Sequence, residues 1–173
     1  MSIFAKMIAG ILAFLLWLFP GSLSLRTMYQ KQIFNMQQSV SAVVNAVNAG
    51  DIAALEAMMC RNIKDNVEDL SSKIGELIGA VDGEIQAYRI ESAGMFTENR
   101  RDGRQIYQRG FGVEFTIPSG DYLIAINWEV VCNFAQEETG IRYIILYSGS
   151  SYDPNTVKLA EIMATEGWGG WHD

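Results

Sequence analysis

Three carboxylates in the second half of the chain are the side chains most able to act as a general base. Burial raises the pKa of a carboxyl group toward the working pH and makes the group a usable base. Glu114 and Glu129, however, fall in the more polar phase of two alternating segments, and Asp121 stands at a turn. No Asp or Glu occupies the apolar phase of either segment. The pattern therefore predicts solvated carboxylates and no catalytic residue.

A second chemistry that these segments suggest is the binding of a small apolar ligand. Arg109 stands between Tyr107 and Phe111 in an otherwise apolar row. A desolvated guanidinium needs a partner, which a ligand carboxylate would supply; alternatively, its stem packs and its head stays in water. The aromatic side chains would either line a pocket or pack the core. The candidate ligand-binding residues are Tyr88, Tyr107, Arg109, Phe111, Trp128 and Tyr143.

The two cysteines, Cys60 and Cys132, allow two interpretations. They form one disulfide if the domain is exported, or they are buried thiols that behave as small hydrophobic side chains. Their spacing fits no metal site, since a zinc site takes four ligands and His172 is the single histidine. No P-loop, dinucleotide-binding, HExxH, paired CxxC or EF-hand motif occurs. The sequence therefore predicts no metal and no cofactor.

Residues 1–25 have the features of a signal peptide or a membrane anchor. Lys6 precedes thirteen uncharged residues, and Pro20-Gly21-Ser22 then breaks the apolar run. This pattern is typical of an export signal, and its length is also close to that of a transmembrane helix. No cysteine lies near the leader, which excludes a lipoprotein anchor. We expect an extracytoplasmic domain, secreted or held at the membrane through this segment.

The elements that must position the candidate residues begin with helices. The apolar spacing predicts a long helix over residues 25–47, which Asn48-Ala49-Gly50 ends. Asp51 is expected to cap a second helix, which ends where Arg61-Asn62 interrupts the pattern. A third helix is predicted over residues 67–81, with its charged side chains on a solvated face.

Beyond Asp82-Gly83 the period changes to two, as in strands. We expect an antiparallel meander of four strands at residues 84–92, 105–117, 122–134 and 141–147, because short turns separate them. Residues 156–165 are expected to form a short helix before a Gly- and Trp-rich tail. The fold class is thus α+β, with a curved, cone-shaped four-stranded antiparallel sheet over helices in residues 26–155, preceded by the hydrophobic leader helix. The sheet's second face, with Leu123, Ala125 and Val131, would support a homodimer.

The segment from Asn48 to Met59, Asn-Ala-Gly-Asp-Ile-Ala-Ala-Leu-Glu-Ala-Met-Met, resembles the first helix junction of the nuclear transport factor 2-like superfamily, which has the cystatin-like cone fold. Within it the chain is most similar to a bacterial family of exported proteins, the domain-of-unknown-function family 5104. Asp69–Glu84 and Tyr143–Tyr147 carry that likeness, which covers residues 27–150. The resemblance implies the cone fold and supplies no activity.

Together these features predict a non-catalytic domain that binds a small ligand or a protein partner outside the cytoplasm. The net charge of -7 and the scattered basic residues argue against nucleic acid. The superfamily resemblance implies one alternative, an isomerase or hydratase that uses a carboxylate inside the cone. The sequence leaves the choice between binding and catalysis open.

Overall fold

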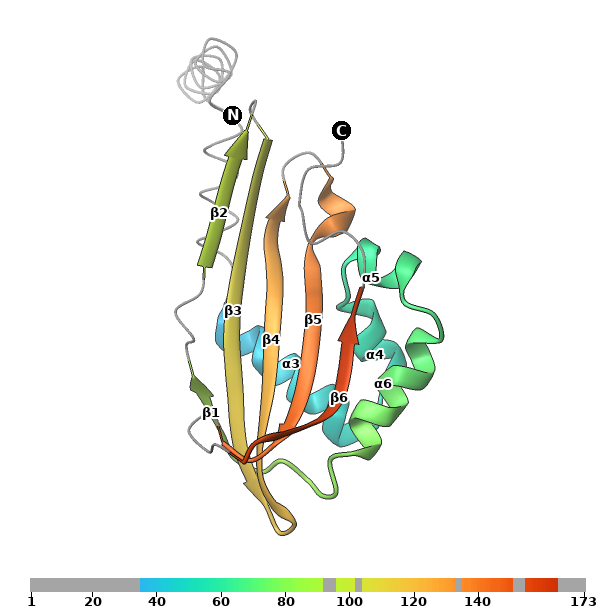
Figure 1. The fold of residues 1–173 in the computed structure, drawn as a ribbon, viewed down its shortest axis with the longest axis vertical. Coiled ribbons are helices and arrows are strands. Elements are labelled where there is room, and N and C mark those ends of the chain that lie inside the picture. Colours follow the sequence, from blue (N-terminus) through green and yellow to red (C-terminus); the bar gives the residue numbers. More distant parts are fainter. Residues whose placement is uncertain (1–34, 92–95, 102–103, 133–134, 151–154, 165–173) are drawn as a thin grey trace, which may run out of the picture. The chain divides into compact units, whose positions relative to one another are not determined.

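The computed structural model describes residues 35–91, 96–101, 104–132, 135–150 and 155–164. The predicted leader and the Trp-rich tail lie outside these ranges. The described part is an α+β domain in which helices pack beside one antiparallel sheet (Figure 1). Within it, no helix has the length and apolar character needed to cross a membrane.

Helix α3, Met36–Ala49, confirms the predicted amphipathic first helix over the residues that can be described. Its valines at helical spacing are buried, which anchors the helix on the core. The side chain of Asn35 accepts a hydrogen bond from the backbone N–H of Gln38 at the start. Gly50 ends the helix in the left-handed conformation, with φ of 64°, as the Asn-Ala-Gly sequence predicted. The buried valines are Val40, Val43, Val44 and Val47.

Three shorter helices follow. In α4, Ile52–Ala57, the Asp51 side chain accepts from the backbone N–H of Ala54 at 2.9 Å, which confirms the predicted cap. The prediction that Arg61-Asn62 interrupts the helices was wrong, because α5, Arg61–Asn66, begins there. Helix α6, Leu70–Gly79, confirms the predicted third helix and buries Leu70, Ile74 and Leu77.

The sheet contains the strands β1 Tyr88–Glu91, β2 Phe96–Arg101, β3 Arg104–Ile117, β4 Gly120–Cys132, β5 Gly140–Ser148 and β6 Val157–Met163. All pair antiparallel in the order β1-β3-β4-β5-β6, and β2 also pairs with β3. β1 and β2 lie one after the other along the same edge of β3, so the sheet is five strands wide (Figure 1). The expected four-strand sheet was therefore too narrow.

The fifth strand position is β6, in the segment that we expected to form a helix. Its apolar residues fit a helical pattern, but the edge of β5 offers unpaired backbone groups that a strand satisfies. Ile162 pairs with Ile144 on β5, and both are fully buried. Tertiary pairing therefore overrides the local pattern.

One face of the sheet carries the hydrophobic core. Phe111, Val113 and Phe115 of β3 lie directly opposite Ile126, Ile124 and Tyr122 of β4, and this row continues onto β5. The rings of Phe115 and Tyr122 stack with centroids 5.5 Å apart. Leu123 and Ala125 on the other face are half-buried, but Val131 is fully buried and so is not part of an exposed dimer surface.

Asn48 ties the end of α3 to the segment that leads into β1. Its side-chain amide donates to the carbonyl of Ile85 at 3.0 Å, and its carbonyl oxygen accepts from the N–H of Ile85 at 2.9 Å. We expect Asn48→Ala to lower the free energy of unfolding by about 1–2 kcal/mol, because two backbone groups lose their partner. Chemical denaturation measures this, with Asn45→Ala on the exposed side of α3 as the control. Equal effects of the two substitutions would contradict the assignment.

Candidate functional site

Glu129 on β4 is the unexpected feature of the sheet. Its residue exposure is 0%, and that of Glu114 on β3 is 9%, so the prediction of solvated carboxylates was wrong for both. One guanidinium nitrogen of Arg142 on β5 lies 2.6 Å from Oε2 of Glu129, and the side-chain amide of Gln108 on β3 donates to the same oxygen at 3.2 Å. We call Gln108, Glu129 and Arg142 the carboxylate cluster. It joins three adjacent strands through one buried charge.

Two irregularities in the strand register lie next to Glu129, but neither inserts a residue into β4 before it. The pairing of β3 with β4 shifts between Tyr107 and Gln108, and the pairing of β4 with β5 shifts between Asn127 and Trp128. The extra residues are Val130 on β4, which follows Glu129, and Arg142 on β5. Glu129 therefore keeps the predicted polar phase of its strand and is nevertheless fully buried, whereas Trp128 in the predicted core row is only half-buried.

The two oxygens of Glu129 have different surroundings. Both described donors, from Arg142 and Gln108, reach Oε2. Oε1 is buried and accepts no hydrogen bond, and it is the one such side-chain atom in the described part of the chain. Buried polar atoms are usually hydrogen-bonded, so an exception calls for a physical explanation. The cluster therefore presents one open acceptor in the interior.

Arg142 balances the charge of Glu129. Burial disfavours the guanidinium cation, but the hydrogen bond and charge of Glu129 outweigh it and raise the pKa of Arg142. The side chain of Arg142 retains 18% exposure, compared with 1% for Glu129. Arg142 thus reaches nearer to solvent than Glu129 does.

Cys60 lies beside this cluster at the start of α5. Its backbone N–H donates to the carbonyl of Ile141 at 3.0 Å, in a parallel bridge that joins residues 58–60 to the start of β5. Burial raises the pKa of the Cys60 thiol, against smaller opposing effects of the Ile63 backbone and Arg142. Cys60 and Cys132 are both buried, as thiols.

The raised pKa of Cys60 has a consequence for stability. As the pH rises, the thiol ionises in the unfolded chain before it ionises in the folded chain. Cys60 therefore does not change the free energy of unfolding below the pKa of the unfolded thiol, and it lowers that free energy above about pH 8.5. We expect the alkaline loss of stability to be smaller in Cys60→Ala than in the unmodified chain, measured by denaturation between pH 7 and 10.

Iodoacetamide should label Cys60 only after unfolding. Rapid labelling of the native protein would contradict the burial of the thiol.

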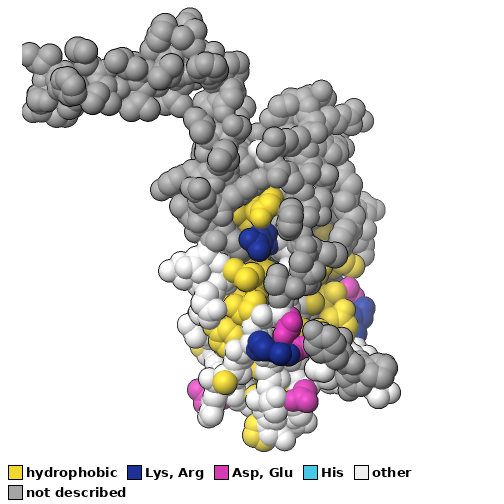
Figure 2. Space-filling view, turned by 90° about the vertical axis from the view of Figure 1, so that its left-hand side faces the viewer, with side chains coloured by type: hydrophobic (Ala, Val, Ile, Leu, Met, Phe, Trp, Pro, Cys, Tyr) yellow, Lys and Arg dark blue, Asp and Glu magenta, His cyan; other side chains and the backbone are white. Residues whose placement is uncertain are grey.

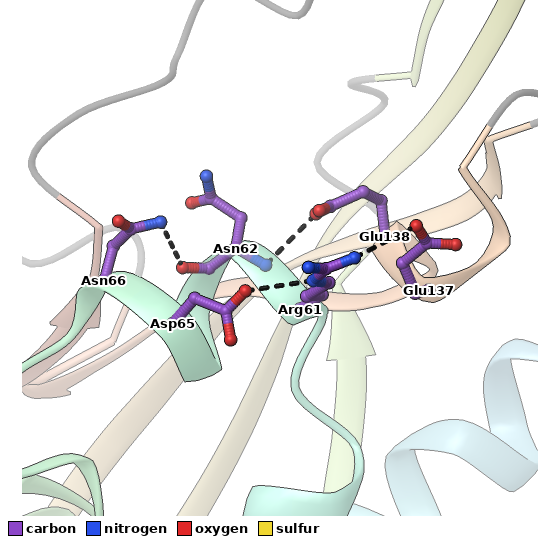
Figure 3. A network of polar contacts seen from close by, with 6 residues as sticks. All are labelled: Arg61, Asn62, Asp65, Asn66, Glu137 and Glu138. Atoms are coloured by element: carbon purple, nitrogen blue, oxygen red, sulfur yellow. Dashed lines mark hydrogen bonds and ion pairs between the residues drawn. The ribbon is translucent and has the colours of Figure 1, made fainter.

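A polar network fastens α5 to the 3-10 helix η1, Gln136–Glu138, in the connection between β4 and β5 (Figure 3). Cys60 at the N-cap provides no side-chain cap. Instead, the carboxylate of Glu138 accepts from the backbone N–H of Asn62 at 3.1 Å. Arg61 pairs with Asp65 and with Glu137. Figure 3 shows these side chains converging from the two helices, so contacts at the surface tie α5 to η1.

A separate groove of about 400 Å³ lies at the other end of the sheet, beside β1. Tyr88, Phe115 and Tyr122 contribute to its walls with polar neighbours. Arg89 and Glu114 pair across β1 and β3 at 2.6 Å, and Arg89 also pairs with Glu91. The space-filling view of the β1 side shows basic and acidic side chains in contact, with hydrophobic side chains above them (Figure 2). The volume of this groove is within the range of small-molecule sites.

The predicted ligand-binding residues do not form one group in the structure. Arg109 lies directly opposite Trp128, so these two share the face of the sheet opposite to Glu129. Tyr143 lies opposite Asn127, on the same face as Glu129. Phe111 is buried in the core, and Tyr88 lines the groove, where its hydroxyl bonds to Ser41 and Gln37 of α3. Tyr107 is half-buried opposite Val131.

The sequence analysis did not single out Gln108 and Arg142, which complete the cluster. Nothing in their local pattern marks them, because Arg142 is the extra residue of a bulge in β5 and Gln108 acts through its pairing with Glu129 on the neighbouring strand. Among the described residues, no group of three His, Cys, Asp or Glu side chains could hold a metal ion.

No curated protein matches the chain. A family profile described as a domain of unknown function, DUF5104, matches residues 42–149, which run from α3 to the end of β5. This range contains Gln108, Glu129 and Arg142 and most of the sheet. Since the match covers more than half of the chain, the protein belongs to the DUF5104 family.

Proposed function

We propose that this protein is a small-molecule-binding domain and that Glu129 is its recognition group. The observation that carries the proposal is the buried Oε1 atom without a hydrogen-bond donor. Leaving such an acceptor unsatisfied costs about 1–3 kcal/mol, and more for a charged group. A ligand that donates to Oε1 removes that cost while Arg142 and Gln108 hold the other oxygen in place.

The proposal includes the cone-shaped fold of the nuclear transport factor 2-like superfamily and a location outside the cytoplasm. The helices beside a long antiparallel sheet, with two bulges that bend its strands, support the cone. The apolar leader in residues 1–25 supports export, by secretion or by anchoring in the membrane.

The test compares two carboxylates in similar ion pairs. Glu129→Gln removes the proposed recognition group, whereas Glu114→Gln removes a carboxylate that is also 2.6 Å from an arginine but lies at the groove. Saturation-transfer NMR against a mixed set of small alcohols, amides, amines and carboxylates reports binding. We expect Glu114→Gln to bind the same members as the unmodified chain and Glu129→Gln to lose them. Retention of all binding by Glu129→Gln would sink the proposal.

The burial of Glu129 also favours a second candidate, an isomerase or hydratase in which this carboxylate removes a proton from carbon. Against it, protonation of Glu129 would remove the charge that pairs with the partly buried guanidinium of Arg142. The two candidates differ in D₂O. A base would place deuterium in a recovered carbonyl ligand, and Glu129→Gln would abolish that exchange, whereas a binding domain returns the ligand unlabelled.

A further inference from the structure

The charges around Glu129 determine which class of ligand can bind at its unsatisfied oxygen, Oε1. Arg142 carries one positive charge against the one negative charge of Glu129, and Gln108 is neutral. The raised pKa of Cys60 keeps its thiol uncharged at neutral pH. Glu138 also acts electrostatically on Arg142, but it lies outside the cluster, where its carboxylate accepts from the N–H of Asn62. The carboxylate cluster is therefore neutral as a unit.

A charged ligand would disturb this balance. A cation would bring an uncompensated charge into an enclosed site, since Arg142 already neutralises Glu129. An anion that carries no hydrogen-bond donor would be repelled by the lone pairs of Oε1. Removing either ion from water is expensive when no opposite charge remains to pair with it. An uncharged N–H or O–H group satisfies Oε1 and leaves the charges balanced.

From this balance we infer that the ligand of Glu129 is an uncharged molecule that presents a hydroxyl or amide donor to Oε1. The inference rests on the proposed function and names its ligand class. The approach is from the Arg142 side, where the cluster retains exposure. Helix α5 and η1 border that side through Cys60 and Glu138.

Three nearly isosteric probes separate the classes: acetamide is neutral with a donor, acetate is an anion without one, and acetamidinium is a cation with donors. The measurement follows the side-chain amide of Gln108 and the Nε–H of Arg142 in ¹H–¹⁵N spectra of the full-length chain during titration. We expect acetamide to shift both signals and to bind at least about tenfold more tightly than the other two. Glu129→Gln should abolish the shift, and Glu114→Gln should preserve it.

Each outcome decides the question. Tighter binding of acetamidinium or acetate at the same signals overturns the ligand class and leaves the proposed function standing. No shift from any probe overturns both. If Glu129→Gln does not fold, the double variant Glu129→Gln/Arg142→Met removes both charges together. Acetamide binding that survives in this variant would equally overturn the assignment to Glu129.

Discussion

Replacing Arg142 with alanine should lower the free energy of unfolding by about 3–5 kcal/mol, the cost of leaving one buried charge of a pair without its partner. Water cannot solvate Glu129 in place of Arg142, since the side chain of Glu129 is only 1% exposed. Gln108 alone would then donate to Oε2. Urea denaturation followed by circular dichroism measures the loss.

Arg89 provides the matched control for this substitution. It also lies 2.6 Å from a strand carboxylate, Glu114, but its own side chain is 66% exposed and that of Glu114 is 10% exposed, compared with 1% for Glu129. Water screens a pair that is open on one side, so Arg89→Ala should cost less than Arg142→Ala. The double variant Glu129→Gln/Arg142→Met should recover part of the loss, because it leaves no unpaired charge. Similar losses for Arg89→Ala and Arg142→Ala would show that burial does not set the strength of these pairs.

The sequence predicted the parts of the fold that local signals determine. The turn residues around Gly50 and the cap at Asp51 work through hydrogen bonds within a few residues, so their positions follow from residue type. The core row of β3 and β4 also followed from alternation up to Ile126. These elements need no information from distant parts of the chain.

What the sequence did not predict depends on partners far along the chain. β6 is a strand because it pairs with the backbone groups at the edge of β5, although the pattern of Val157–Met163 fits a helix. Glu129 pairs with Arg142 of the next strand, at a bulge whose position no residue type marks. Glu129 keeps the phase that alternation predicts, so the error was to expect that its face of the sheet is wet along the whole strand.

Gly140→Ala should lower the free energy of unfolding by about 2–4 kcal/mol, because it strains the backbone and forces a collision. Gly140 has a φ of 130°, which residues with a side chain rarely adopt. A Cβ there would lie 2.5 Å from the carbonyl oxygen of Met58 and 2.9 Å from the nitrogen of Cys60. Both contacts are with backbone, which cannot move aside as a flexible side chain does.

The collision falls on the bridge that holds α5 next to the carboxylate cluster. The N–H of Ile141 donates to the carbonyl of Met58 at 2.8 Å, so moving Met58 breaks this bond and displaces Cys60. Gly79→Ala is the control, since a Cβ in α6 meets nothing within 4 Å and alanine favours helix by up to about 1 kcal/mol. The two substitutions should therefore change stability in opposite directions, and Gly140→Ala should also expose Cys60 to iodoacetamide. A Gly140→Ala protein as stable as the unmodified chain would mean that residues 58–60 do not pair with β5 in solution.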